Sequence, residues 1–217
     1  MSISFHAGCY FTPYQERENM FYSLYRCCRR HGFEYLAAER YAPTIEEQIQ
    51  NIATNKADSF WVRSEEGEML VSICEKPEEF DFPPNSKIAL LHFIFNYYFI
   101  TTDNTPQNQK FLERVVSLQL SLYTAYGAEL GWAGYSPTIP SAMEYHSAKV
   151  KALYWFNIFG PRFVETLGRQ KLLGAPVWLI KELPDGSVLV RLSEHPHVYE
   201  KVGGVYLHEC LGLEYMG

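Results

Sequence analysis

The sequence predicts an α/β protein of the α+β type, a single domain over residues 1–217 with a mostly antiparallel or mixed sheet and covering helices. Three observations predict this class. Short apolar and aromatic runs typical of strands are bounded by turn residues, two pairs of these runs are spaced as hairpins, and stretches of helical periodicity lie between them. We find no repeat of fixed period, low-complexity run or linker, which favours one domain over two.

The first third of the chain predicts one strand and two helices. The aromatic run Ile3–Phe11 is compatible with a strand. After Pro13, apolar residues recur at helical spacing, and Gly32 is placed to end that helix. Pro43 and Thr44 begin a second helix, which ends by Asp58.

A hairpin and a long strand are expected next. The segments Phe60–Arg63 and Met69–Cys74 flank an acidic turn, so they predict a β-hairpin whose tip is exposed to water. The run Ile88–Thr101 is apolar and aromatic enough to form a long central strand.

The second half of the chain begins with the clearest helix. Thr105 and Pro106 start it and Gly127 ends it, because apolar residues form one stripe of period 3.6 between them. The remaining expected elements are a short strand and loop at 131–137, a buried strand over Leu153–Phe159, one short helix or two helical turns over Phe163–Leu173, and a hairpin of Val177–Leu183 with Val188–Leu192.

Charge and composition limit the classes of partner. Hydrophobic residues make up 47% of the chain, so a sizeable core is expected. The net charge of -6 argues against binding to nucleic acid, which needs clustered Lys and Arg. A basic protein partner is favoured instead.

We expect a cytoplasmic protein with no membrane contact. No signal peptide pattern is present over Met1–Pro13, and the longest apolar run, Ile88–Ile100, is shorter than the ~20 residues that span a bilayer. The five cysteines are an odd number without CxxC spacing, which argues against a disulfide framework and a zinc ribbon.

Known catalytic motifs are absent, so we do not expect an enzyme. The patterns GxSxG, SxxK and GxxxxGK[ST] do not occur. A thiol nucleophile at Cys9 or Cys74 with a histidine stays open as an alternative, although a free cysteine is more often a small buried hydrophobe.

Neither a metal nor a cofactor is expected. The best candidate ligands are His195, His197 and His208, but their spacing is not that of a zinc motif, and surface histidines around a proline turn are the simpler interpretation. The pair Gly203-Gly204 lacks the third glycine of a dinucleotide-binding loop.

The most distinctive feature is an acidic tract between positions 65 and 81. It contains seven acids opposed only by Lys76. One interpretation is a solvated loop that keeps the protein soluble, and the other is a surface that steers a basic partner, with Trp61, Phe80 and Phe82 as anchors. On the second interpretation the partner-binding residues are Glu65, Glu66, Glu68, Glu75, Glu78, Glu79 and Asp81.

One segment resembles a known family. The run Tyr154–Glu165, followed by Leu167–Arg169, Leu172–Leu173, the step Ala175-Pro176 and a hairpin to Leu192, is similar to the carboxyl-terminal half of the immunity protein 52 family. The resemblance implies a protein that binds and neutralises a nuclease toxin delivered by a type VI or related secretion system, by occlusion and without catalytic residues. We expect the motif itself to be structural, with Pro161 in a first helical position and Phe163 in the core.

Two other functions stay open. A small-molecule-binding domain or enzyme with an aromatic-lined pocket would need no recognisable motif. An adaptor or structural component of a secretion apparatus is also compatible with the composition.

Overall fold

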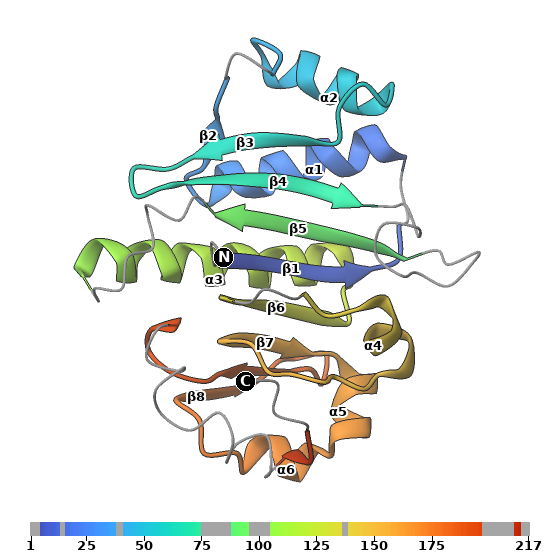
Figure 1. Cartoon of the computed structure of the whole chain (residues 1–217), viewed down its shortest axis with the longest axis vertical. Coiled ribbons are helices and arrows are strands. Elements are labelled where there is room, and N and C mark those ends of the chain that lie inside the picture. Colours follow the sequence, from blue (N-terminus) through green and yellow to red (C-terminus); the bar gives the residue numbers. More distant parts are fainter. Residues whose placement is uncertain are drawn as a thin grey trace.

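A single sheet forms the centre of the computed structural model, which describes residues 5–13, 16–37, 41–74, 88–95, 105–135, 139–196 and 211–213. Within these residues the sheet has nine strands in the order β2-β3-β4-β5-β1-β6-β7-β9-β8 (Figure 1). Every pair of neighbouring strands is antiparallel. The α+β class is therefore confirmed, and the described sheet is antiparallel rather than mixed.

The strands are β1 (Phe5–Phe11), β2 (Glu34–Tyr35), β3 (Ser59–Arg63), β4 (Glu68–Cys74), β5 (Ala89–Phe95), β6 (Leu130–Tyr135), β7 (Phe156–Phe159), β8 (Leu179–Glu182) and β9 (Val188–Arg191). The helices are α1 (Arg17–Arg30), α2 (Ile45–Ala53), α3 (Pro106–Tyr126), α4 (Ala142–Ser147), α5 (Pro161–Leu167) and α6 (Arg169–Leu173).

Most predicted elements are present. Both hairpins form, and so do the three long helices. The prediction missed the two-residue strand β2 and the short helix α4, which carry too few residues for a periodic signal. The predicted strand over Leu153–Phe159 begins only at Phe156, and positions 96–101 of the expected long strand lie outside the described residues.

Local capping explains where the helices begin and end. The hydroxyl of Thr44 accepts a hydrogen bond from the backbone N–H of Glu47 at the start of α2, and Thr105 does the same at the start of α3. Gly127 ends α3 in the left-handed conformation at φ 58°, which a glycine adopts without steric cost.

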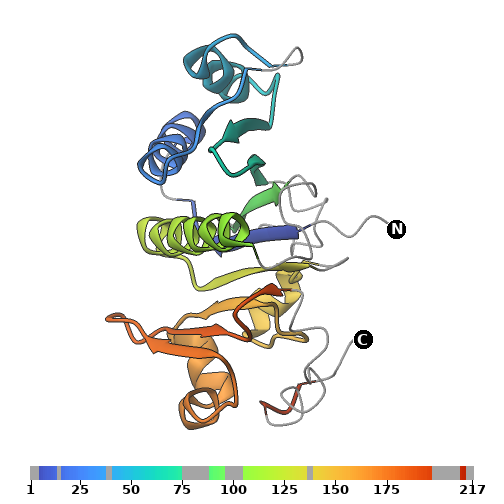
Figure 2. The same cartoon turned by 90° about the vertical axis from the view of Figure 1, so that its left-hand side faces the viewer.

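Helices cover one face of the sheet. Alternate residues of β1 point to this face, where Phe5, Ala7 and Cys9 are fully buried in the larger hydrophobic cluster, which also includes buried residues of α1, α2 and α3. Figure 2 shows α1, α2 and α3 on the same side of the strands. Of the helices that the structure describes, none has both the length and the apolar composition needed to cross a bilayer.

The described helices cover the opposite face of the sheet only toward one end. Toward one end, Tyr10 and Trp132 are buried in a second cluster with Tyr145 of α4 and Phe163 of α5. Across β3, β4, β5 and β1 the same face keeps partial exposure, and we call this part the open face. Its half-buried residues are His6, Trp61, Leu70, Ser72, His92 and Ile94.

Candidate partner-binding surfaces

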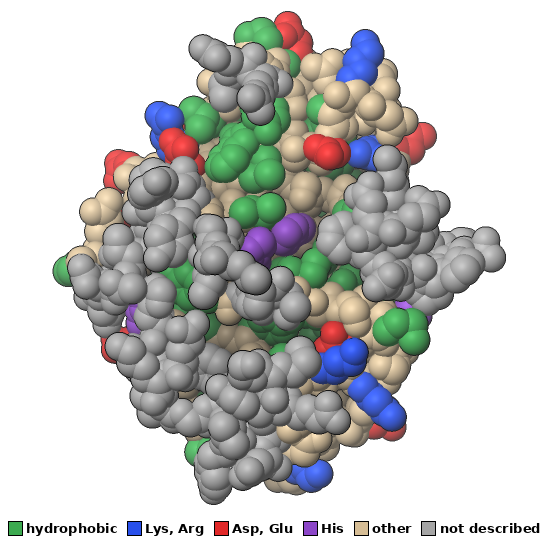
Figure 3. All heavy atoms as spheres, in the orientation of Figure 1, with side chains coloured by type: hydrophobic (Ala, Val, Ile, Leu, Met, Phe, Trp, Pro, Cys, Tyr) green, Lys and Arg blue, Asp and Glu red, His purple; other side chains and the backbone are tan. Residues whose placement is uncertain are grey.

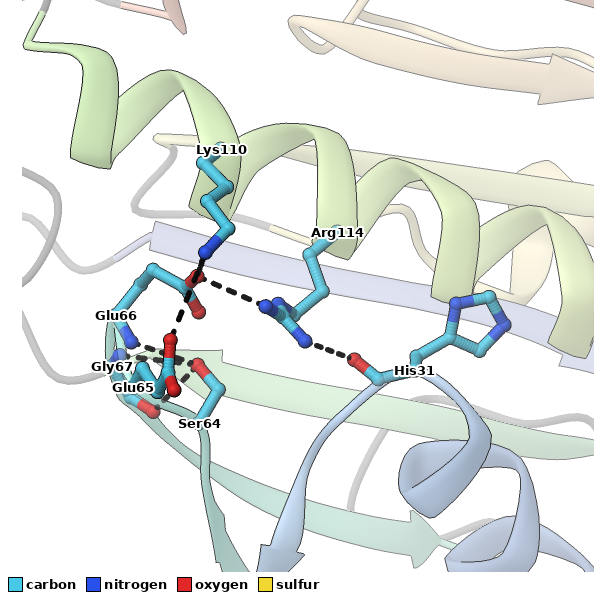
Figure 4. A network of polar contacts seen from close by, with 7 residues as sticks. All are labelled: His31, Ser64, Glu65, Glu66, Gly67, Lys110 and Arg114. Carbon is cyan, nitrogen blue, oxygen red and sulfur yellow. Dashed lines mark hydrogen bonds and ion pairs between the residues drawn. The ribbon is translucent and has the colours of Figure 1, made fainter.

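The acidic tip of the β3–β4 hairpin packs against α3. One carboxylate oxygen of Glu66 lies 2.8 Å from Nζ of Lys110 and 2.9 Å from a guanidinium nitrogen of Arg114 (Figure 4). Only 3% of the Glu66 side chain is exposed. Glu66 is therefore a buried carboxylate that joins the hairpin to α3 through two cations, the exposed Lys110 and the partly buried Arg114.

Hydrogen bonds fix the turn that delivers this carboxylate. The hydroxyl of Ser64 accepts from the backbone N–H groups of Glu66 and Gly67, each at 3.2 Å. Arg114 uses a second nitrogen to donate to the carbonyl of His31 at 2.8 Å, so the same guanidinium also holds the end of α1. Arg114 thus links three segments that are distant in sequence.

Charge pairing lowers the pKa of Glu66. Burial by itself raises the pKa of this carboxyl, but hydrogen bonds from Lys110, Arg114 and Ser64 outweigh burial and bring the pKa to about 2. The expectation of a hairpin tip exposed to water is wrong for Glu66. The sequence pattern could not reveal the two cations, because they lie on a helix that is distant along the chain.

The other acids of the tract have different positions. Glu65 is 88% exposed and lies 3.7 Å from Lys110, while Glu68 pairs with Arg63 at 2.8 Å on the open-face side of the hairpin. The other four predicted partner-binding acids lie outside the described residues; these are Glu75, Glu78, Glu79 and Asp81. Of the three described acids, Glu65 alone presents a highly exposed carboxylate.

The candidate metal ligands and nucleophile form no common site within the described residues. His195 is buried, and His197 and His208 lie outside the described residues. No group of three or more His, Cys, Asp or Glu side chains placed to hold a metal occurs in the described part of the chain. Cys9 faces the helices, and burial raises the pKa of its thiol to about 12, which keeps it protonated and unreactive at neutral pH.

Two stacked histidines occupy the centre of the open face. Nδ1 of His6 lies 3.0 Å from Nε2 of His92, and the two rings are nearly parallel, with an angle of 9° between their planes. Figure 3 shows histidine side chains over β1 and β5 with hydrophobic side chains around them. The antiparallel register brings them together, because His92 lies opposite Gly8, two residues from His6.

Both imidazoles are neutral at pH 7. Burial and, to a smaller extent, the neighbouring His6 together lower the pKa of His92 to about 4. Burial also lowers the pKa of His6. A neutral pair can share one N–H···N hydrogen bond and still offer a donor and an acceptor at its outer edge.

A glycine makes the close packing beside the pair possible. The ring of Trp132 tilts beside His92 with 5.9 Å between ring centroids, and it passes over Gly8. A Cβ at Gly8 would lie 2.5 Å from the carbonyl oxygen of Leu91 and 2.9 Å from the Trp132 ring. Only glycine fits between the indole and the neighbouring strand.

Apolar and aromatic residues flank the histidines. Trp61 is half-buried, and its indole N–H donates to the hydroxyl of Tyr41 at 3.0 Å. Leu70 lies between Trp61 and Ile94 in the strand register. An apolar and aromatic centre with a few polar groups and a charged rim is the composition of a protein–protein interface core.

Sequence reasoning identified Trp61 as an anchor but missed His6 and His92. The alternation of His6, Gly8 and Tyr10 indicates one face of a strand. Which residues of another strand lie beside them depends on strand order and register, and neither can be read from the sequence without a hairpin turn between β1 and β5.

The segment that carries the family resemblance forms β7, α5, α6 and the β8–β9 hairpin. Pro161 is the first residue of α5 and Phe163 is fully buried, as expected. Asn157 is buried and bonds both the N–H and the carbonyl of Tyr154 through its side chain. Arg162 bonds the carboxylate of Glu129, so the motif's polar residues have structural contacts.

The chain matches no protein-family model, and no curated protein shows significant similarity to it.

Proposed function

We propose that this protein binds and neutralises a nuclease toxin in the cytoplasm, without catalysis, as an immunity protein against a toxin delivered by a type VI or related secretion system. One sequence interpretation and one observation support the proposal. The interpretation is the similarity of residues 154–192 to the immunity protein 52 family, and the observation is the open face, which has the composition of a protein-binding surface. The proposal that the toxin is bound through a protein–protein interface rests on the composition of the open face.

The open face is suited to contact with a protein because it can lose water at low cost. Its central imidazoles, His6 and His92, are neutral at pH 7, so their burial against a partner removes no charge from water. Trp61 and Leu70 offer apolar area beside them. Aromatic residues near the centre of an interface contribute most of the binding energy in typical complexes.

The charge of the protein favours a basic partner. With a net charge of -6, the chain attracts the basic surface with which a nuclease contacts DNA. Glu65 at the hairpin tip and the acids between positions 75 and 81 are proposed to accelerate this encounter. Glu66 does not belong to this group, because its carboxylate is buried against Lys110 and Arg114.

Coexpression tests the proposal. The protein is produced together with nuclease domains encoded beside its gene, and cell survival and copurification are scored. We expect one nuclease to be toxic alone, tolerated with the protein, and recovered with it in a complex. If no neighbouring nuclease is neutralised or copurifies, the proposal is wrong.

A matched pair of leucines tests the surface. Leu70→Glu places a charge on the open face, whereas Leu179→Glu places the same charge on the exposed edge strand β8. We expect Leu70→Glu to abolish both survival and copurification, and Leu179→Glu to preserve both. Retention of binding by a folded Leu70→Glu variant would place the interface elsewhere.

A further inference from the structure

A pocket of about 720 Å³ lies away from the open face, between α4, α5, α6 and residues 211–213. In Figure 1 these three helices occupy the lower part of the molecule. A pocket of this volume is within the range that holds a small organic ligand.

Three lysines line the pocket. Lys149 and Lys151 follow the end of α4, and Lys171 is on α6. All three are exposed, and none of their ammonium groups forms an ion pair with a carboxylate of the described residues. The net charge of the protein is -6, so three cations at one pocket with no acidic partner among the described residues make this region locally positive.

The one acid in the described lining is already engaged. Glu144 is buried, and its carboxylate accepts hydrogen bonds from the backbone N–H and hydroxyl of Ser141 and from the backbone N–H of Lys151. The contact with the Ser141 N–H, together with the backbone N–H of Glu144 donating to the Ser141 hydroxyl, forms the capping box of α4. The Glu144 carboxylate therefore accepts its hydrogen bonds from neighbouring groups of the chain. The ammonium groups of the three lysines remain able to bind an anion.

The rest of the lining is largely apolar. Val150, Leu167 and Leu211 are buried residues that border the pocket, and Met143 is 57% exposed beside them. An exposed methionine at a pocket adapts to the shape of an apolar ligand. The lining therefore combines an apolar wall with exposed cations.

We propose that this pocket binds an amphipathic anion, with its apolar chain against Val150, Leu167 and Leu211 and its carboxylate or phosphate facing Lys149, Lys151 and Lys171. The proposal is independent of toxin binding, since the pocket and the open face are formed by different elements. It assigns the protein a second binding site for a small acyl or alkyl anion.

Calorimetric titration of the full-length protein tests this site. The probes are dodecanoate and dodecyl phosphate below their micelle concentrations, dodecanol as the neutral analogue, and inorganic phosphate as the head group alone. We expect one or both amphipathic anions to bind, and the neutral alcohol and inorganic phosphate to bind at least about tenfold more weakly. The stronger of the two anions identifies the head group.

Lysine variants locate the binding. The combination Lys149→Gln, Lys151→Gln and Lys171→Gln is expected to weaken binding of the anion at least about tenfold and to remove its salt dependence. Lys56→Gln with Lys181→Gln, two exposed lysines outside the described lining, is the control and is expected to leave affinity unchanged.

Four results would overturn the proposal. These are no binding of either anion, equal binding of dodecanol, equal binding of inorganic phosphate, and equal affinity in the lysine variant. The substituted lysines are exposed, so the variant is expected to keep its fold, which circular dichroism checks. We also expect it to neutralise the toxin as the unsubstituted protein does, so failure at this site is distinguishable from failure of the proposed function.

Discussion

Nδ1 of His6 and Nε2 of His92 lie 3.0 Å apart on neighbouring central strands. This distance requires one nitrogen to donate and the other to accept, so at most one proton occupies the space between the rings. Two imidazolium ions there would each direct an N–H at the other. The pair is therefore stable when both rings are neutral, and protonation of both rings is unfavourable.

Acid is expected to destabilise the folded protein through this pair. The pKa of His92 is lowered to about 4 from an ordinary 6.5, and that of His6 is also lowered. The unfolded chain therefore binds protons that the folded pair does not, and the free energy of unfolding decreases as pH falls from about 6.5 to about 4. Urea unfolding across this range measures the slope.

Histidine variants distinguish the contribution of His6 and His92 to this pH dependence from the contributions of other titrating groups. The double variant His6→Gln with His92→Gln is expected to show a smaller decrease in unfolding free energy between pH 6.5 and pH 4. His146→Gln, which changes an exposed histidine, is the control and is expected to keep the original slope. An unchanged slope in the double variant would contradict the assignment.

Glu66 is expected to act in a lower pH range, where protonation removes a charge instead of creating one. Its pKa is lowered to about 2 from 4.5, so its ionised form stabilises the fold above about pH 4.5, and this contribution is lost as pH falls toward 2. Water screens this network, because the side chains of Lys110 and Arg114 are 61% and 22% exposed. Glu66→Gln is therefore expected to lower the unfolding free energy at pH 7 by about 1–2 kcal/mol. Glu65→Gln at the neighbouring exposed carboxylate is the control, with an expected change below about 0.5 kcal/mol.

The contrast between Glu65 and Glu66 shows what the sequence can predict here. Turn residues and strand periodicity predicted the hairpin, since they are local properties of the chain. The different environments of two adjacent acids depend on Lys110 and Arg114, which a tertiary contact brings to one of them. Local patterns carry no information about that contact.

The histidine pair on the open face also could be predicted only in part from the sequence. Strand β1 was predicted, and its alternation separates His6 from Phe5. The partner His92 lies eighty-six positions away, and the sheet order places β5 and β6 on either side of β1. Sequence periodicity identifies the face of each strand but not the order in which strands assemble.

Gly8→Ala is expected to be strongly destabilising. The added methyl group would lie 2.5 Å from a backbone carbonyl oxygen and 2.9 Å from Trp132, and neither can move without disturbing the centre of the sheet. We expect a loss of about 3 kcal/mol or more in unfolding free energy. Gly127→Ala is the comparison, because nothing lies within 4 Å there and only its left-handed backbone is strained, which costs about 1 kcal/mol. Equal losses in the two variants would contradict the packing explanation.

Removing acids of the tract other than Glu66 and Glu68 is expected to slow capture of the toxin. Acids steer a basic partner at long range, so their amides should lower the association rate roughly three- to tenfold and flatten its dependence on salt, with little change in the dissociation rate. The substituted residues are Glu65, Glu75, Glu78, Glu79 and Asp81. Surface plasmon resonance against the nuclease found by coexpression measures both rates.

A matched charge change elsewhere is the control for this experiment. Glu46→Gln with Glu47→Gln removes two exposed acids from the first turn of α2. We expect a smaller effect on association than the same number of substitutions within the acidic tract. If association is equally fast in the tract variant and in the unsubstituted protein, the tract is a solubilising loop and does not steer the partner.

The stability of the fold is expected to depend on the planar guanidinium group of Arg191 and not only on its positive charge. Its guanidinium carbon lies 4.6 Å from the centre of the Trp155 ring and 4.4 Å from that of Trp178, and it forms an ion pair with Glu113. A planar cation can stack between two indoles, whereas the ammonium of lysine cannot. Arg191→Lys should therefore lower the unfolding free energy by about 1–3 kcal/mol and change the fluorescence of the buried Trp155. Arg169→Lys, at an exposed pair with Glu182, is expected to change stability by less than about 1 kcal/mol, and equal effects of the two substitutions would argue against a stacking role for Arg191.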